Sequence, residues 1–192
     1  MGIKWLNELI DDYIEARSEP GKLVKRKYLL KLREYYKNNS NSIEHLELEE
    51  VLTRAAWAKD YNGNRHSHQR RLKKKVLEQI NTLFSDRKGD FKNCSSFEDI
   101  FKIVSECRIK GFGPLAIYDA SFRISVYLDL LPTQVHLHAG VRTGAQSLGL
   151  DISKGYITVE LLPDEFKKLE VCEIEDFLCI YKYKIVECGN EN

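Results

Sequence analysis

The sequence predicts a mostly α-helical fold, in which several helices form a domain around a helix-hairpin-helix and an N-terminal helical extension precedes it. Apolar residues recur at spacings of three and four through most of the chain, which is the period of a helix. Residues 109–129, IKGFGPLAIYDASFRISVYLD, combine the glycines of a tight turn with a proline suited to the first turn of a helix. A chain of 192 residues is long enough to bury the core of one such domain.

We expect two parts along the chain. Residues 1–40 form an N-terminal helical segment packed on the core, and residues 41–192 form the helix-hairpin-helix domain. Within the first part, apolar faces predict helices over 3–16 and 22–37, and a Pro-Gly pair separates them.

The second part contains most of the predicted helices. Ser42 and Ser96 are typical N-cap residues for two of them. The predicted helices cover 42–59, 69–84, 96–108, 114–129 and 138–148. Residues 156–162 have some strand character, and 163–169 favour a short helix that opens with acidic residues. Residues 173–184 fit either a helix or a buried strand, and we favour the helix.

The charges are unevenly distributed, although the net charge is only +1. Residues 65–75, RHSHQRRLKKK, hold six Lys or Arg and two His without an acid, and residues 22–37 form a second basic run. Residues 160–176 are acidic. A basic face suits a polyanion such as nucleic acid, but a solvated helix face explains the same run.

The cysteines and the hydropathy indicate a cytoplasmic protein. Five cysteines, an odd number without a C-x-x-C pair or a signal-peptide pattern, favour reduced thiols. No apolar run reaches the roughly 20 residues that span a bilayer, so we expect no membrane partner. Phosphate-binding and dinucleotide-binding fingerprints are missing, and we expect no cofactor.

The predicted hairpin offers a site for phosphate. Without side chains at Gly111 and Gly113, backbone N–H groups can point outward beside the start of a helix, where a phosphate oxygen is favoured. Phe112 would fill the junction between the helices. Such a contact positions a duplex without identifying its bases. The alternative is a turn that only joins two helices.

The chain resembles the helix-hairpin-helix DNA glycosylases related to endonuclease III. Residues 109–113 are similar to their hairpin, Leu131-Pro132 to the loop after the long helix, and Leu148-Gly149-Leu150 to the end of the next helix. The resemblance covers about 100 residues, from roughly 52 to 150. It implies a helical DNA-repair fold that flips the target base into a pocket.

The departures from this family concern catalysis. Pro114 and Leu115 stand where lyase-competent members carry a Lys, which removes support for a Schiff base. The segment between Pro132 and His138 contains no carboxylate, and His138 falls at the place of the catalytic Asp. Asp129 is the better placed of the nearby acids. The iron–sulfur cluster of some relatives needs four closely spaced cysteines after this helix. Only Cys172, Cys179 and Cys188 follow it, at wide intervals, so we exclude the cluster.

We therefore predict a DNA-binding protein that contacts the phosphate backbone and need not be catalytic. An active, divergent glycosylase that uses Asp129 or His138 is one alternative, and a protein-interaction scaffold is another. Two His-x-His pairs could in principle meet around a metal, but lying beside basic residues they favour phosphate or water, and we expect no metal site. The predicted DNA-binding residues are Arg65, His66, His68, Arg70, Arg71, Lys74, Lys110, Gly111, Phe112, Gly113, Leu115 and His136.

Overall fold

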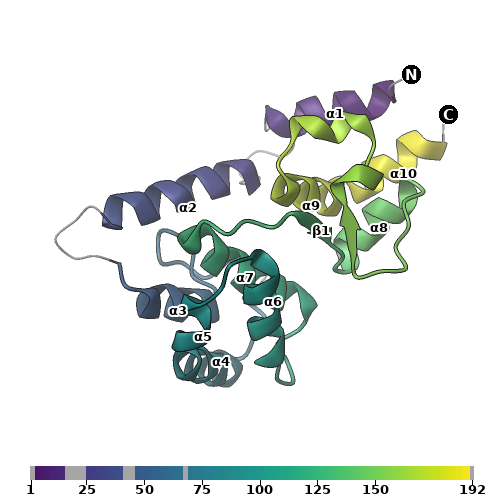
Figure 1. The fold of residues 1–192 in the computed structure, drawn as a ribbon. Coiled ribbons are helices and arrows are strands. Elements are labelled where there is room, and N and C mark those ends of the chain that lie inside the picture. The colour runs from purple at the N-terminus through teal and green to yellow at the C-terminus, as the bar shows by residue number, and fades with distance from the viewer. Residues whose placement is uncertain (1–2, 16–24, 41–45, 67–68, 191–192) are drawn as a thin grey trace. The chain divides into compact units, whose positions relative to one another are not determined.

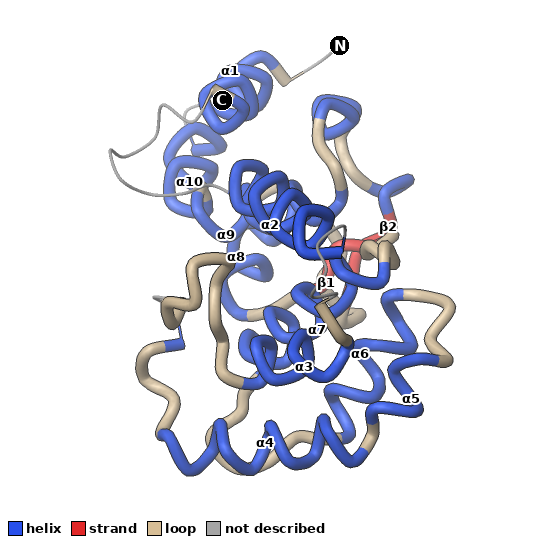
Figure 2. The backbone as a smooth tube through the Cα atoms, turned by 90° about the vertical axis from the view of Figure 1, so that its left-hand side faces the viewer, coloured by secondary structure: helices blue, strands red, loops and turns tan. Residues whose placement is uncertain are grey.

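The computed structural model describes residues 3–15, 25–40, 46–66 and 69–190. These residues form ten α-helices and one small two-stranded sheet (Figure 1), and the two short strands stand out in red among the helices in Figure 2. The predicted mostly α-helical class is confirmed. No helix within the described ranges combines the length and the apolar character needed to cross a membrane.

The chain divides into two compact units that do not coincide with the predicted division at residue 40. Residues 29–132 form the middle unit, and residues 1–28 together with 133–192 form the terminal unit. Of the segment predicted over residues 1–40, residues 3–15 group with the C-terminal part of the chain, whereas residues 29–40 belong to the middle unit.

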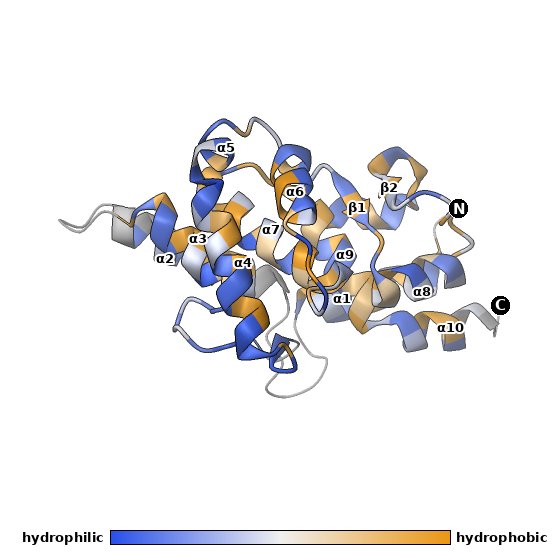
Figure 3. Cartoon of the chain, turned by 90° about the horizontal axis from the view of Figure 1, so that it is seen from below, coloured by the Kyte–Doolittle hydropathy of each residue, from blue (hydrophilic) through white to orange (hydrophobic). Residues whose placement is uncertain are grey.

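The middle unit contains the hairpin. Its helices are α2 (Lys25–Ser40, which begins just before the unit), α3 (Leu48–Ala56), α4 (Lys74–Asp86), α5 (Lys88–Lys92), α6 (Phe97–Glu106) and α7 (Pro114–Leu128). The helices α4 and α6 each carry hydrophobic and hydrophilic stretches, orange and blue in Figure 3. Their apolar faces meet α3 and α7 in one core that includes Phe84, Ile100 and Ile117. This core fixes the two helices that the hairpin joins.

The starts of α6 and α3 can be compared with the predicted ones. Ser96 caps α6 as predicted, because its hydroxyl accepts a hydrogen bond from the Asp99 N–H at 3.1 Å. The helix predicted from residue 42 begins at Leu48 instead, and Ser42 lies outside the described residues. The short helix α5 was not predicted, since five residues carry too little periodicity.

The basic helix predicted over 69–84 begins five residues late, at Lys74. The side chain of Gln69 points into the protein, and the Arg65 guanidinium donates to the Leu72 carbonyl oxygen. These bonds hold residues 69–72 in an irregular segment ahead of the helix. We call the described residues 65, 66 and 69–73 the basic loop.

The terminal unit brings the two ends of the sequence together. Its elements are α1 (Lys4–Ile14), β1 (Gln134–His136), α8 (Ala139–Ser147), β2 (Tyr156–Thr158), the 3-10 helices η2 (Val159–Leu161) and η3 (Asp164–Lys168), α9 (Val171–Ile180) and α10 (Lys182–Asn190). In Figure 1, α1 in purple lies beside C-terminal elements in yellow-green. The Tyr13 hydroxyl donates to Asp176 at 3.2 Å, and the Tyr181 hydroxyl donates to Asp12 at 2.7 Å.

The strands and the last helices agree in part with the predictions. Antiparallel β1 and β2 pair Val135 with Ile157, so the strand character of 156–162 is confirmed for its first three residues, whereas β1 was not predicted. The preferred helix over 173–184 is present as α9 and α10, which meet at Tyr181. The helices α8 and α9 pack so closely that a Cβ at Gly144 would overlap the carbonyl oxygen of Leu178.

Candidate nucleic-acid interface

A tight turn connects α6 to α7, as the sequence predicts. The Phe112 N–H donates to the Ile109 carbonyl oxygen at 3.0 Å, which closes a four-residue turn. Gly111, the third residue of this turn, has φ of +100°, a conformation that residues with a Cβ rarely adopt. The Phe112 ring is buried in the core of the middle unit. The turn is therefore fixed by its backbone hydrogen bond and by the buried side chain of its last residue, Phe112.

Gly111 also makes a close contact with α4. A Cβ at this position would lie 3.2 Å from Cγ2 of Val76, in the first turn of α4. Gly113 differs, because it has φ of −89° and an added Cβ would meet nothing within 4 Å. Gly111 is thus required by conformation and packing, whereas Gly113 faces open space.

The start of α7 leaves backbone donors available. Gly113 is the N-cap residue, and its carbonyl oxygen accepts from the Ile117 N–H at 3.0 Å. Pro114 has no N–H, and the N–H groups of Gly113 and Leu115 donate to no backbone oxygen in the described residues. Such donors, at the positive end of a helix dipole, favour an anion.

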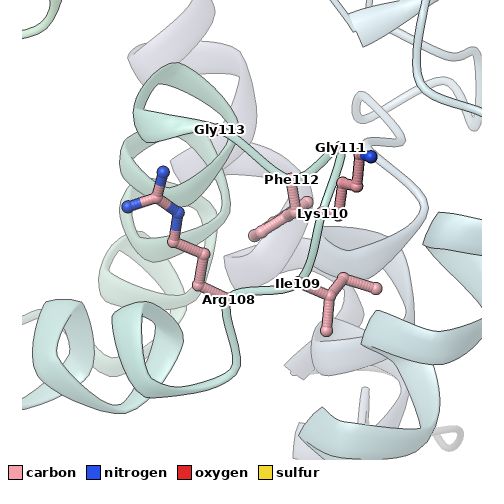
Figure 4. A pocket seen from close by; sticks show the side chains of 6 residues that line it. All are labelled: Arg108, Ile109, Lys110, Gly111, Phe112 and Gly113. Carbon is pink, nitrogen blue, oxygen red and sulfur yellow. The ribbon is translucent and has the colours of Figure 1, made fainter.

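An open pocket of about 440 Å³ is lined by the six residues of this connection, 108–113. Figure 4 shows the Lys110 side chain beside Gly111, while the Arg108 side chain extends away on the other side of the connection. Both side chains are exposed, and the Phe112 ring points between them toward the helices. The hairpin therefore presents one cation, Lys110, beside Gly111.

The basic loop is anchored by backbone contacts, while Arg70 and Arg71 face solvent. At its start, the His66 N–H donates to the Ala58 carbonyl oxygen at 2.9 Å, and Arg65 pairs with Lys59 in an isolated β-bridge. Arg70 and Arg71 are exposed. The loop consequently holds two guanidinium groups at the surface of the middle unit.

Three lysines mark the start of α4. Lys73 is the N-cap residue, Lys74 and Lys75 follow, all three are exposed, and the first turn contains no acid. Cations at the positive end of a helix dipole are unfavourable without a compensating anion. Lys74 lies 3.6 Å from Glu78 in an exposed pair that contributes little. Because Val76 faces Gly111, the first turn of α4, which also carries Lys74 and Lys75, packs against the hairpin turn.

We use the name hairpin–lysine surface for the exposed cations of the basic loop, of the start of α4 and of Lys110, together with the backbone amides of the hairpin. It consists of Arg70, Arg71, Lys73, Lys74, Lys75, Lys110, Gly111, Gly113 and Leu115. Of the other predicted DNA-binding residues, Arg65 and His66 are half-buried in the basic loop, His68 lies outside the described residues, and Phe112 is buried.

The remaining predicted histidines belong to the terminal unit and are buried. His136 ends β1, and burial lowers its pKa to about 4 although the nearby Glu175 carboxylate acts in the opposite direction. His136 is therefore neutral at pH 7 and cannot act as a cation for phosphate. His138, the N-cap residue of α8, contacts the buried Glu175 carboxylate through Nε2.

The candidate catalytic residues lie in different units. Asp129 is the exposed C-cap residue of α7 and has φ of +56°, whereas His138 is in the terminal unit. Asp119, in the middle of α7, accepts a hydrogen bond from Gln69. The described residues contain no group of three His, Cys, Asp or Glu side chains that could hold a metal ion.

Sequence reasoning missed two polar contacts, Gln69 with Asp119 and His138 with Glu175. The partners in each pair are 50 and 37 residues apart. An acid such as Glu175 in the apolar stretch VCEIEDFLCI is the one indication that the sequence offers, because such an acid is buried only with a partner.

Comparison with protein-family models, with curated proteins and with solved structures finds no match to this chain.

Proposed function

We propose that the middle unit binds DNA through its phosphate backbone, using the hairpin–lysine surface. The observation that carries the proposal is the close approach of Val76 to Gly111, because it packs the lysine-bearing first turn of α4 against the hairpin turn. Two kinds of group that bind phosphate, backbone N–H groups and exposed cations, then lie on neighbouring segments of one unit. Contacts of both kinds position a duplex without selecting its sequence.

The electrostatics of α4 support the proposal. Lysines at the start of a helix destabilise it slightly, so their clustering there is unexplained by the fold alone. An anion bound at this point would turn the unfavourable interaction into a favourable one. The α4 lysines, the loop arginines and Lys110 together supply six exposed cations.

A second candidate function is an N-glycosyl hydrolase activity, favoured by one observation. The Glu175 carboxylate contacts Nε2 of His138, an arrangement that orients an imidazole as a general base. A His138→Gln variant tests it. Loss of base release from damaged duplexes that the wild type cleaves supports the activity, and no release by the wild type argues against it.

The DNA-binding proposal is tested with a fluorescein-labelled duplex and the double variant Arg70→Ala/Arg71→Ala. We expect uniformly weaker binding to unrelated duplex sequences, because phosphate contacts carry no base information. Lys92→Ala is the matched control, since Lys92 is exposed on α5, which follows the opposite end of α4 from Lys74. Equal affinity of the wild type and the double variant would contradict the proposal. Salt-insensitive association with a protein partner would favour a scaffold instead.

A further inference from the structure

A buried side chain fastens the basic loop to the second helix of the hairpin. Gln69 is only 3% exposed, and its Nε2 donates to Oδ2 of Asp119 on α7 at 2.7 Å. The Gln69 backbone is held as well, because its N–H donates to the His66 carbonyl oxygen at 3.0 Å and its own carbonyl oxygen accepts from the Leu72 N–H at 3.1 Å. Gln69 is thus the inner anchor of the loop.

The residues next to this anchor point the other way. Arg70 and Arg71 are exposed, and Leu72, which follows them, packs against the core of the middle unit. The two arginines therefore stand between inward-facing residues on both sides. Their position at the surface depends on Gln69 staying in place.

Asp119 is an unexpected neighbour for a surface that would hold a polyanion. Its negative charge opposes DNA by Coulomb repulsion. The hydrogen bond to its carboxylate comes from the uncharged Gln69 amide. What Asp119 supplies is a hydrogen-bond acceptor for a buried amide.

We infer that Asp119 is a positioning residue for nucleic-acid binding: by accepting the hydrogen bond of Gln69, it holds the basic loop with Arg70 and Arg71 at the surface. This inference rests on the proposed function. It assigns an acidic residue a favourable role in binding a polyanion, which charge alone would not predict.

The physical consequence differs between two substitutions. Asp119→Ala removes the acceptor and leaves a buried amide donor unpaired, so the loop must open to hydrate it. Asp119→Asn keeps a carbonyl oxygen as acceptor and removes only the charge. The hydrogen bond and the charge therefore have opposite effects on DNA affinity, and the two variants separate them.

The experiment measures Kd for a fluorescein-labelled 20-base-pair duplex by fluorescence polarisation with the full chain. We expect Asp119→Ala to weaken binding by about three- to ten-fold and Asp119→Asn to bind at least as tightly as the wild type. Glu78→Ala is the matched control, because it removes an exposed acid beside Lys74 without touching the loop interior, and it should tighten binding.

Gln69→Ala gives a second route that leaves every charge in place. It should weaken binding like Asp119→Ala, and the double variant should lose much less than the product of the two effects. Binding by Asp119→Ala that equals or exceeds that of the wild type would overturn the inference, as would equal weakening by Asp119→Asn. Failure of the wild type itself to bind would instead overturn the proposed function.

Discussion

Gly111 contacts Val76 so closely that a Cβ at position 111 would lie 3.2 Å from Cγ2 of Val76, which links the hairpin turn to the first turn of α4. The two residues are 35 positions apart in the sequence. Their contact determines which cations accompany the hairpin. The proposed function depends on this one packing relationship.

The contact predicts the stability of variants at Gly111. Gly111→Ala should lower the free energy of unfolding by about 1–3 kcal/mol, because alanine is strained at φ of +100° and its Cβ crowds Val76. Adding Val76→Ala should remove the crowding but not the strain. Urea unfolding of the two single variants and the double variant measures the coupling. Strictly additive losses of stability would mean that the Cβ added at position 111 does not meet the Val76 side chain.

Gly113 should behave differently. Asparagine fits its φ of −89° and the open space around it, and is a better N-cap residue than glycine. We expect Gly113→Asn to retain or raise the stability of the fold while weakening DNA binding, because its side-chain oxygen competes with phosphate for the amides at the start of α7. Unfolding and polarisation measurements on the same preparation test this. Unchanged DNA affinity would show that these amides do not contact phosphate.

At Lys75, as at Gly113, one substitution should change fold stability and DNA affinity in opposite directions. Lys75→Glu places an acid at the positive end of the α4 dipole, so the free energy of unfolding should rise by about 0.3–1 kcal/mol. The same change should weaken DNA binding, because it reverses a charge on the hairpin–lysine surface. Thermal unfolding and the duplex Kd test the two effects. A variant that is more stable and binds equally well would remove Lys75 from the interface.

His136 predicts how stability depends on pH. Its pKa is lowered from the ordinary 6.5 to about 4 by burial, so between these values the unfolded chain binds more protons than the folded one. The contribution of His136 to the free energy of unfolding is fully present above pH 6.5 and decreases as the pH is lowered toward 4. The difference corresponds to at most about 3 kcal/mol. Urea unfolding of the wild type and His136→Gln at pH 7 and pH 4.5 tests it, and parallel losses in both would exclude His136 as the cause.

The sequence predicts features that local chemistry controls. The turn before α7 follows from Gly111 and Pro114, and the start of α6 follows from the Ser96 cap, because each depends on neighbouring residues alone. The strand β1 was missed because three residues carry no measurable period. The late start of α4 was missed because it depends on Gln69 reaching Asp119, a contact that sequence spacing does not reveal.

The same distinction applies to the candidate site. The hairpin amides and the basic residues were identified from the sequence, but their proximity could not be, since it depends on Gly111 packing against Val76. The grouping of α1 with the C-terminal helices likewise depends on contacts such as Tyr13 with Asp176, 163 positions apart. Side-chain chemistry was accessible from the sequence, whereas long-range pairing was not.

The central claim is tested most directly by measuring the duplex Kd of the wild type from about 50 to 200 mM salt. Each neutralised phosphate contributes about −0.9 to the slope of log K against log salt, so four or five contacts predict a slope of about −4. A slope near that value would support backbone binding by the hairpin–lysine surface. A slope near zero, or no binding at the lowest salt, would contradict it.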